Sequence, residues 1–144
     1  MPEAVEAIYE RPGDYDLEHE GDDEDIEFYV RLLRQLRPKR VLELASGSGR
    51  VTVPLAAAAS ELDCHIVGLE IADTMLEAAR QKASALDAEA AGRLEFVRAD
   101  LRTWKSDQPF DLIITPCSSL SHLLSLEDQL AAWRTAHRNL AAGG

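Results

Sequence analysis

The sequence predicts an α/β protein with a doubly wound parallel sheet, and three features of the 144-residue chain indicate this class. Short apolar runs of the kind found in buried parallel strands alternate with longer segments whose apolar residues recur at helical intervals. A glycine turn joins the first apolar run to a helix, and an acidic residue stands at or just after the end of each of the next two runs. With 46% hydrophobic residues, the chain is suited to one ordinary domain.

The acidic residues are concentrated in an amino-terminal arm, predicted over residues 1–25, which precedes a domain predicted over residues 26–144. Residues 1–27 carry twelve acidic side chains and one basic side chain, whereas the rest of the chain is balanced. We expect the arm to be irregular, apart from a turn of helix near residues 4–10. Because a negatively charged arm repels phosphate backbones, the sequence argues against a nucleic-acid partner.

Composition disfavours several other classes of protein. No run approaches the roughly 18 apolar residues that a membrane-spanning helix needs, and no basic-then-apolar leader precedes the acidic start. Cys64 and Cys117 have neither the spacing of metal ligands nor the pattern of a secreted disulfide framework. We therefore expect a cytoplasmic protein with no membrane partner and no bound metal.

The first predicted elements surround the glycine turn. Apolar residues at helical spacing predict a helix over residues 25–36, and residues 41–44 form a short apolar run typical of a parallel strand. Gly47 and Gly49 allow positive φ angles and the close approach of a ligand. The first N–H groups of the next helix, predicted over residues 51–60, face the same point. The turn is therefore a candidate nucleotide-binding site.

The neighbours of this turn indicate which nucleotide it fits. A dinucleotide fingerprint has a third glycine three residues after the second, and that position is Thr52 here. Instead, Glu43 stands four residues before Gly47. The stretch V-L-E-L-A-S-G-S-G resembles motif I of the class I S-adenosylmethionine-dependent methyltransferases, commonly V-L-D-L-G-C-G-T-G. Ala45 and Ser46 replace a usual glycine and a frequent cysteine, and both are small enough for the turn.

A second buried strand, predicted over residues 65–70, ends in Glu70, which lies 21 residues after Gly49. At about this separation, a nucleotide-binding fold presents a carboxylate to the ribose hydroxyls. Alternatively, Glu70 is a solvent-facing acid at the start of the next helix, predicted over residues 74–86. In the family that the chain resembles, the residue after this acid lies against the adenine, and here that residue is Ile71.

The third strand, predicted over residues 93–97, alternates apolar and charged residues, as expected at a sheet edge. The segment F-V-R-A-D-L at its end resembles a family motif whose acid, here Asp100, accepts a hydrogen bond from the adenine amino group. The next residue of the motif, here Leu101, meets the adenine ring through its backbone. Asp100 can also be interpreted as an ordinary turn residue.

A fourth strand, predicted over residues 110–115, leads into Pro116 and the run C-S-S-L-S-H-L. Open α/β sheets place substrate chemistry at such a carboxyl strand end beside the first strand. The run resembles the segment F-D-L-I-x-x-P-x-N-S-x-x-H-L of small-molecule methyltransferases, which implies that Pro116 borders the cofactor. His122 would then remove a proton from an amine or hydroxyl acceptor, or it is a structural histidine bonded to the backbone.

The resemblance implies a Rossmann-like, three-layer αβα fold with strand order 3-2-1-4, in which the later carboxyl-terminal strands of the family are missing. A weak capping box at Ser125 would open the last helix. The fourth strand would then lie at the edge of the sheet with both apolar faces exposed. We expect a partner to cover this strand, either a second copy in a homodimer or a complementing carboxyl-terminal segment.

The resemblance also implies a reaction: transfer of a methyl group from S-adenosylmethionine to a nitrogen or oxygen of a small-molecule acceptor, with S-adenosylhomocysteine as product. The turn from Ala45 to Gly49 would hold the methionine end of the cofactor, and Glu43 would reach its ammonium group directly or through water. Glu70 and Asp100 would orient the adenosine end.

The role of the arm depends on its two tyrosines. Similar methyltransferases often carry tyrosines in an amino-terminal lid that folds over the cofactor, which would place Tyr15 at the cofactor and let Tyr9 help to close the site. As isolated aromatic residues, the two tyrosines could equally pin the arm to the domain. On composition alone, the arm is a solvated tail.

Two other functions fit the same motifs. A nicotinamide-dependent oxidoreductase would use the same carboxylate after the second strand, but Thr52 disfavours it because the third fingerprint glycine is missing. A non-catalytic nucleotide-binding or assembly fragment would show all the motifs without turnover.

Overall fold

Four parallel strands form a single sheet in the order β3-β2-β1-β4. The structure, a computed structural model, describes residues 11–18, 20–21, 23–116, 123 and 125–144. The strands are β1 (Arg40–Leu44), β2 (His65–Glu70), β3 (Leu94–Arg98) and β4 (Leu112–Ile114). In the register of β1 with its neighbours, Leu42 pairs with Val67 of β2 and with Ile113 of β4. The predicted class and strand order are confirmed.

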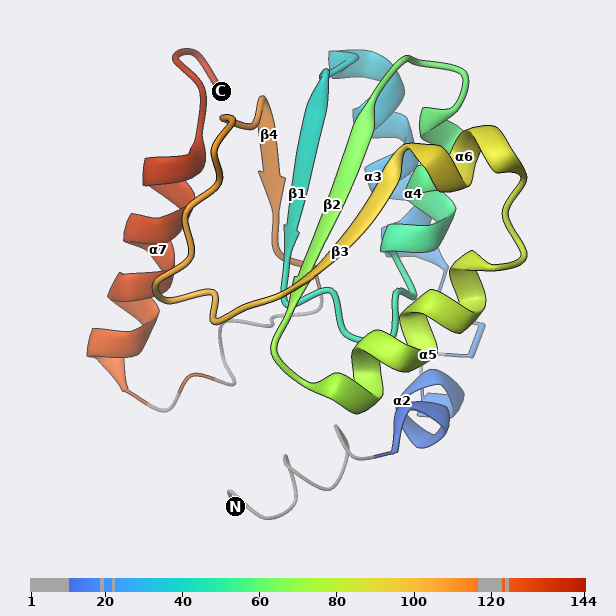
Figure 1. Ribbon diagram of the computed structural model, residues 1–144, viewed down its shortest axis with the longest axis horizontal. Coiled ribbons are helices and arrows are strands. Elements are labelled where there is room, and N and C mark those ends of the chain that lie inside the picture. The colour runs from blue at the N-terminus through green and yellow to red at the C-terminus, as the bar shows by residue number, and fades with distance from the viewer. Residues whose placement is uncertain (1–10, 19, 22, 117–122, 124) are drawn as a thin grey trace.

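Helices cover both faces of the sheet, which gives the predicted three layers (Figure 1). One face carries α3 (Glu24–Leu36), α4 (Thr52–Ala59), α5 (Asp73–Ala83) and α6 (Ala88–Gly92), and the other carries α7 (Leu126–Asn139). Ser125 caps α7 as predicted, because its side chain accepts a hydrogen bond from the Asp128 N–H at 3.0 Å. Among the described residues, the helices lack the combination of length and hydropathy that a membrane span requires.

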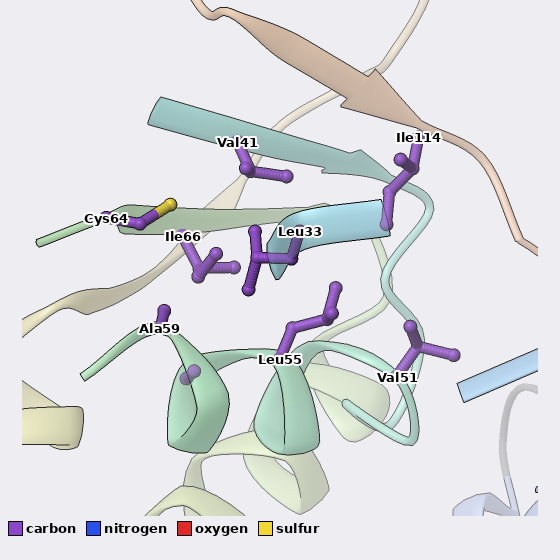
Figure 2. Close-up of a cluster of buried hydrophobic side chains, with 9 residues drawn as sticks. Leu33, Val41, Val51, Leu55, Ala59, Cys64, Ile66 and Ile114 are labelled. Carbon is purple, nitrogen blue, oxygen red and sulfur yellow. The ribbon is translucent and has the colours of Figure 1, made fainter. Parts of the chain in front are cut away.

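A buried cluster lies between the sheet and the layer of α3 and α4 (Figure 2). Its members come from α3, from α4 and the residue before it, from strands β1, β2 and β4, and from the residue before β2: Leu33, Val41, Val51, Leu55, Ala56, Ala59, Cys64, Ile66 and Ile114. A second cluster lies under α7, formed by Leu42, Leu44, Val67, Leu69, Phe110 and Ala136. Burial on both faces explains why β1 and β2 are almost continuously apolar.

The arm contains a helix, α2 (Pro12–Glu18), that packs beside α5. The prediction of an irregular arm is wrong over these residues. Proline at the first helical position has a suitable fixed φ and lacks an N–H that would in any case be unpaired. Asp14 in the first turn adds a favourable charge. The turn of helix predicted over residues 4–10, and Tyr9 with it, lie outside the described residues.

The helix predicted over residues 74–86 is observed as α5, which begins one residue earlier and is three residues shorter at its end. It ends at Ala83, and a separate short helix, α6, begins after Asp87. The Asp87 carboxylate accepts a hydrogen bond from the Ala90 N–H at 2.8 Å, which is the capping contact that starts a new helix. This short helix lies beyond the predicted range and was not anticipated from the sequence.

The edge strand β4 is shorter and better covered than predicted. Ile114 is buried and Leu112 packs against the cluster beside α3, whereas Ile113 packs against the cluster under α7. The chain also returns alongside Phe110, whose N–H donates to the Asn139 carbonyl at 2.8 Å. The prediction that both faces of this strand are exposed is therefore wrong. Among the described residues, β4 is paired as a strand with β1 alone, while Phe110 just before it forms an isolated parallel bridge with Leu140.

Candidate functional site

The glycine turn at the carboxyl end of β1 has the backbone that the sequence predicts. Gly47 and Gly49 have φ angles of 57° and 79°, and Ala45 has a φ of 53°. A side chain at Gly49 would come within 3.1 Å of the Ala79 Cβ, so the turn packs tightly on α5 at this position. A side chain at Gly47 would meet none of the described residues within 4 Å, so within that part of the chain open space borders the turn there.

Glu70 fastens this turn to the end of β2. One carboxylate oxygen accepts a hydrogen bond from the Gly47 N–H at 2.9 Å, and the other accepts from the N–H groups of Ile71 and Ala72 at 2.8 and 2.9 Å. Glu70 is buried, so the interpretation of this residue as a solvent-facing acid is wrong. The carboxylate holds the two loops at the carboxyl edge of the sheet in a fixed relation.

Glu43 lies beneath the turn, only 2% exposed. Its carboxyl group accepts a hydrogen bond from the Thr52 hydroxyl at 2.5 Å. Burial raises the pKa of Glu43 to about 8, against a lowering by the Thr52 hydrogen bond and by the charge of Arg50. The group is therefore largely protonated near neutral pH.

Ser46 fits against a glycine of the neighbouring strand. Its N–H donates to the Leu69 carbonyl at 2.9 Å, which joins the turn to β2. A Cβ on Gly68 would lie 2.9 Å from the Ser46 hydroxyl oxygen and 2.9 Å from the Phe96 ring. Among the described residues, the buried Ser46 hydroxyl has no hydrogen-bond partner. The side chain thus packs into the sheet, and its backbone forms part of the turn.

Asp100 follows β3 and is held by an arginine. Both of its carboxylate oxygens accept from the Arg102 guanidinium, with the shortest contact at 2.7 Å, and Oδ1 also accepts from the Arg102 backbone N–H at 2.9 Å. Arg102 also donates to Asp128 of α7 at 2.9 Å. Hydrogen bonds from Arg102 hold the pKa of Asp100 below its ordinary value, and those from Arg102 and Ser125 do the same for Asp128.

The remaining predicted site residues are placed as follows. Ile71 is 55% exposed beside Glu70, so an apolar surface is available there. Leu101 lies in the turn after Asp100 with its side chain against the cluster under α7, and Pro116 is buried just after β4. Tyr15 belongs to α2, but its side chain is outside what the structure describes, as is His122.

The fold and the motifs agree with those of known methyltransferases. A family model for a methyltransferase domain matches residues 41–144. The chain belongs to this methyltransferase domain family. This membership confirms the resemblance to class I S-adenosylmethionine-dependent methyltransferases that motif I carries.

Individual relatives of the methyltransferase domain point the same way. The trans-aconitate 2-methyltransferase of Streptomyces avermitilis is 36% identical over 107 residues, which cover 74% of this chain and 37% of that protein. The solved structure of the CcbJ methyltransferase from Streptomyces caelestis matches with a TM-score of 0.72 at 27% identity, covering 83% of this chain and 46% of CcbJ.

A third relative was solved with a ligand. It is the glycopeptide N-methyltransferase MtfA complexed with S-adenosyl-L-methionine, which matches with a TM-score of 0.64 at 27% identity, covering 73% of this chain and 44% of MtfA. The chain therefore spans less than half the length of these three proteins.

Two side chains of the methyltransferase domain have contacts that the motifs did not predict. Thr52, noted in the sequence only as a missing glycine, satisfies the buried Glu43. Arg102, which no motif singled out, connects Asp100 to α7. No local pattern indicated this role, because Asp128 lies 26 residues further along the chain. No group of three or more His, Cys, Asp or Glu side chains among the described residues has the arrangement of a metal site.

A hollow of about 500 Å³ borders the arm side of the glycine turn. Asp16, Gly49 and Lys82 line it, together with residues that precede α3. Its lining, within the described part of the chain, includes neither Glu70 nor Asp100. The hollow therefore shares Gly49 with the glycine turn but does not reach the two carboxylates that follow β2 and β3.

Proposed function

We propose that this domain binds S-adenosylmethionine at the carboxyl ends of β1 and β2 and transfers the methyl group to a nitrogen or oxygen of a small-molecule acceptor, leaving S-adenosylhomocysteine. The observation that carries the proposal is the contact between Glu70 and Gly47, which gathers a glycine turn, an acceptor carboxylate and the exposed Ile71 at one edge of the sheet. Open α/β sheets bind nucleotides at this edge.

The chemistry of these residues fits the cofactor. Space beside Gly47 permits a ligand to approach the backbone without meeting a side chain of the described residues. Glu70 supplies acceptors for two ribose hydroxyls, although its oxygens already accept from three N–H groups and would share them. Ile71 offers an apolar surface to a purine ring.

Glu43 and Asp100 have more indirect parts in this proposal. Glu43 is enclosed and bonded to Thr52. We therefore propose that it acts on the cofactor ammonium through water or through the glycine turn, rather than by direct contact. An adenine amino group would compete with Arg102 for an Asp100 oxygen. Leu101 and Pro116 remain proposed neighbours of the adenosine, and Tyr15 of the cofactor as a whole.

When bound, the cofactor supplies an activated sulfonium methyl group. The work of the protein is then to hold the acceptor atom, the methyl carbon and the sulfur in line within a partly dry site. Glu70 and the Gly47–Gly49 turn orient the two ends of the cofactor. His122 remains the proposed base for an amine or hydroxyl acceptor, since an imidazole with an ordinary pKa suits that role.

The proposed acceptor class is supported by the names of two relatives, whereas a third, 28% identical over 87 residues, is named a tRNA1(Val) (adenine(37)-N6)-methyltransferase. One of the two is named a trans-aconitate 2-methyltransferase, and the other a glycopeptide N-methyltransferase. Neither of these two names refers to a nucleic-acid substrate. The acidic arm also argues against a nucleic-acid acceptor. We therefore infer a small or peptide-like acceptor bearing an oxygen or nitrogen nucleophile.

A titration of the purified chain with S-adenosylhomocysteine, and separately with NAD, tests the cofactor. Saturable binding of the first alone supports the proposal, and preferential binding of NAD would replace it with the oxidoreductase alternative. A methyl-release assay on this chain and on a longer one tests the reaction. Cofactor binding without turnover by either chain would leave a non-catalytic binding module.

Substitution of Glu70 tests the site itself. Glu70→Ala should weaken S-adenosylhomocysteine binding by about 2 kcal/mol, roughly thirtyfold, because charge-assisted hydrogen bonds are lost. Glu77→Ala, which removes an exposed carboxylate from α5, is the matched control and should bind normally. Unchanged affinity in a folded Glu70→Ala protein would remove this residue from the site.

We also propose that a second copy of the chain pairs with the outer edge of β4. The exposed apolar residues of α7 support such a contact, because Leu126, Leu130 and Trp133 recur on the helix at intervals of four and three residues. A complementing carboxyl-terminal segment is the alternative occupant. Light scattering should show a dimer that Trp133→Glu weakens. A stable monomer at high concentration, with normal amide protection over residues 112–114, would contradict the proposal.

A further inference from the structure

Asp16 of α2 contacts the middle of the glycine turn. The Ser48 hydroxyl donates to one Asp16 carboxylate oxygen at 2.6 Å, and the Lys82 ammonium lies 2.6 Å from the other. Lys82 also donates to the Ser48 hydroxyl oxygen at 3.0 Å. The arm, the glycine turn and α5 are therefore joined by one closed set of three side chains.

The position of Ser48 gives this contact its importance. Ser48 lies between Gly47 and Gly49, the two most conformationally permissive residues of the turn, and is 0% exposed. Because Asp16 of the arm holds the Ser48 side chain, the backbone of the two glycines on either side of Ser48 is restricted. Glu70 holds the Gly47 N–H from the side of the sheet. The turn is thus fixed from two directions by groups on different elements.

We infer that Asp16 and Lys82 are positioning residues for the glycine turn, and that docking of α2 and binding of ligand at the turn therefore strengthen each other. For its ligand, the inference rests on the function proposed above. A turn already held in one conformation loses less conformational freedom when a ligand binds. By the same coupling, a ligand that selects this conformation favours the docked position of α2.

The contact is suited to a reversible role. The Asp16 and Lys82 side chains are 31% and 35% exposed, so water and salt reach the ion pair although Ser48 is enclosed. Partly exposed ion pairs are weak and are screened by salt. The coupling should therefore decline with ionic strength, which an enclosed apolar contact would not do.

Amide hydrogen exchange on the ligand-free protein tests the positioning role without the cofactor. Asp16→Asn and Lys82→Gln should each speed exchange of the Gly47 and Gly49 amides by roughly threefold or more, because the local opening is less opposed. Asp14→Asn, which removes the same charge from the same helix, is the matched control, since Asp14 contacts Arg11 rather than the turn. Lys82→Arg should restore protection.

Titration with S-adenosylhomocysteine tests the coupling. Asp16→Asn should weaken binding by roughly three- to tenfold, Ser48→Ala should do the same, and the double variant should lose no more than either one. Raising NaCl from about 0.05 M to about 0.5 M should weaken binding to the original chain more than binding to Asp16→Asn.

The outcomes separate the two proposals. If the original chain binds no S-adenosylhomocysteine, the proposed function fails and the exchange experiment still decides the role of Asp16. If the chain binds but Asp16→Asn exchanges and binds as the Asp14→Asn control does, the positioning role is overturned. Additive losses in the Asp16→Asn and Ser48→Ala pair would also overturn it.

Discussion

The Thr52 hydroxyl donates to the enclosed carboxyl group of Glu43 at 2.5 Å, across the turn between the first strand and α4. Glu43 carries a pKa of about 8 because burial disfavours its charged form. Folding therefore retains a proton that the unfolded chain, with an ordinary carboxyl pKa of 4.5, releases at neutral pH.

This retained proton predicts that stability falls as pH rises. The folded-state pKa is raised, so the folded state binds more protons than the unfolded state between about pH 4.5 and about pH 8. Glu43 should lower the free energy of unfolding by up to about 1.4 kcal/mol per pH unit in this window. Urea unfolding of Glu43→Gln should show a flatter pH dependence, because the amide is neutral throughout. Parallel curves for the two proteins would contradict the raised pKa.

Ala45→Gly should stabilise the fold. Ala45 has a φ of 53°, a region that costs an L-residue with a side chain roughly 1–2 kcal/mol. Part of that gain is offset by the greater freedom of glycine in the unfolded chain, which leaves a net gain of about 0.5–1 kcal/mol. The control is Ala57→Gly on the exposed side of α4, which should lose about 1 kcal/mol in the same denaturation experiment. A loss in both variants would show that Ala45 is unstrained.

Gly68→Ala should destabilise the sheet. The added Cβ would lie 2.9 Å from both the Phe96 ring and the Ser46 hydroxyl oxygen, so side chains around it must shift. Overpacking of this kind typically costs about 1–3 kcal/mol. Gly92→Ala in α6 provides the comparison, because a Cβ there meets none of the described residues within 4 Å, and its stability should be unchanged or slightly higher.

Arg102→Ala should raise the pKa values of Asp100 and Asp128 toward their ordinary value. Both are held low chiefly by hydrogen bonds from Arg102, so these carboxylates stabilise the fold at neutral pH and lose that effect as acid protonates them. Carboxyl carbon chemical shifts followed through an acid titration measure the change. Arg98→Ala, which removes an arginine paired with Asp73 instead, should leave both titrations as they were.

Much of the architecture was predictable because it follows from residue patterns with one physical meaning. Continuous apolar runs indicate β1 and β2, and Gly47 and Gly49 indicate a turn that needs positive φ. The burial of Glu70 could be anticipated from its position at the end of an apolar strand. Its three backbone donors could not, because they depend on how two loops meet.

Contacts between distant segments were not predictable from local patterns. The helix of the acidic arm is docked by Asp16 on Lys82, 66 positions further along the chain, and acid-rich composition alone indicates a solvated tail. Likewise, the ion pair between Arg102 and Asp128 depends on how α7 packs against the rest of the domain. The residues that cover the two faces of β4 were also not predictable. The apolar run of this strand indicates that it is buried, but it does not indicate which elements pack against it.

The cluster beside α3 encloses a thiol. Cys64 is fully buried there, and burial raises its pKa to about 11, so almost none of it is thiolate at neutral pH. Only the thiolate reacts readily with alkylating reagents. In a Cys117→Ser background, labelling of Cys64 would therefore require this core to open, and its rate would report how often the folded chain exposes the start of β2. Cys64 is therefore a built-in chemical probe for transient opening of this core, at the end of β2 remote from the glycine turn.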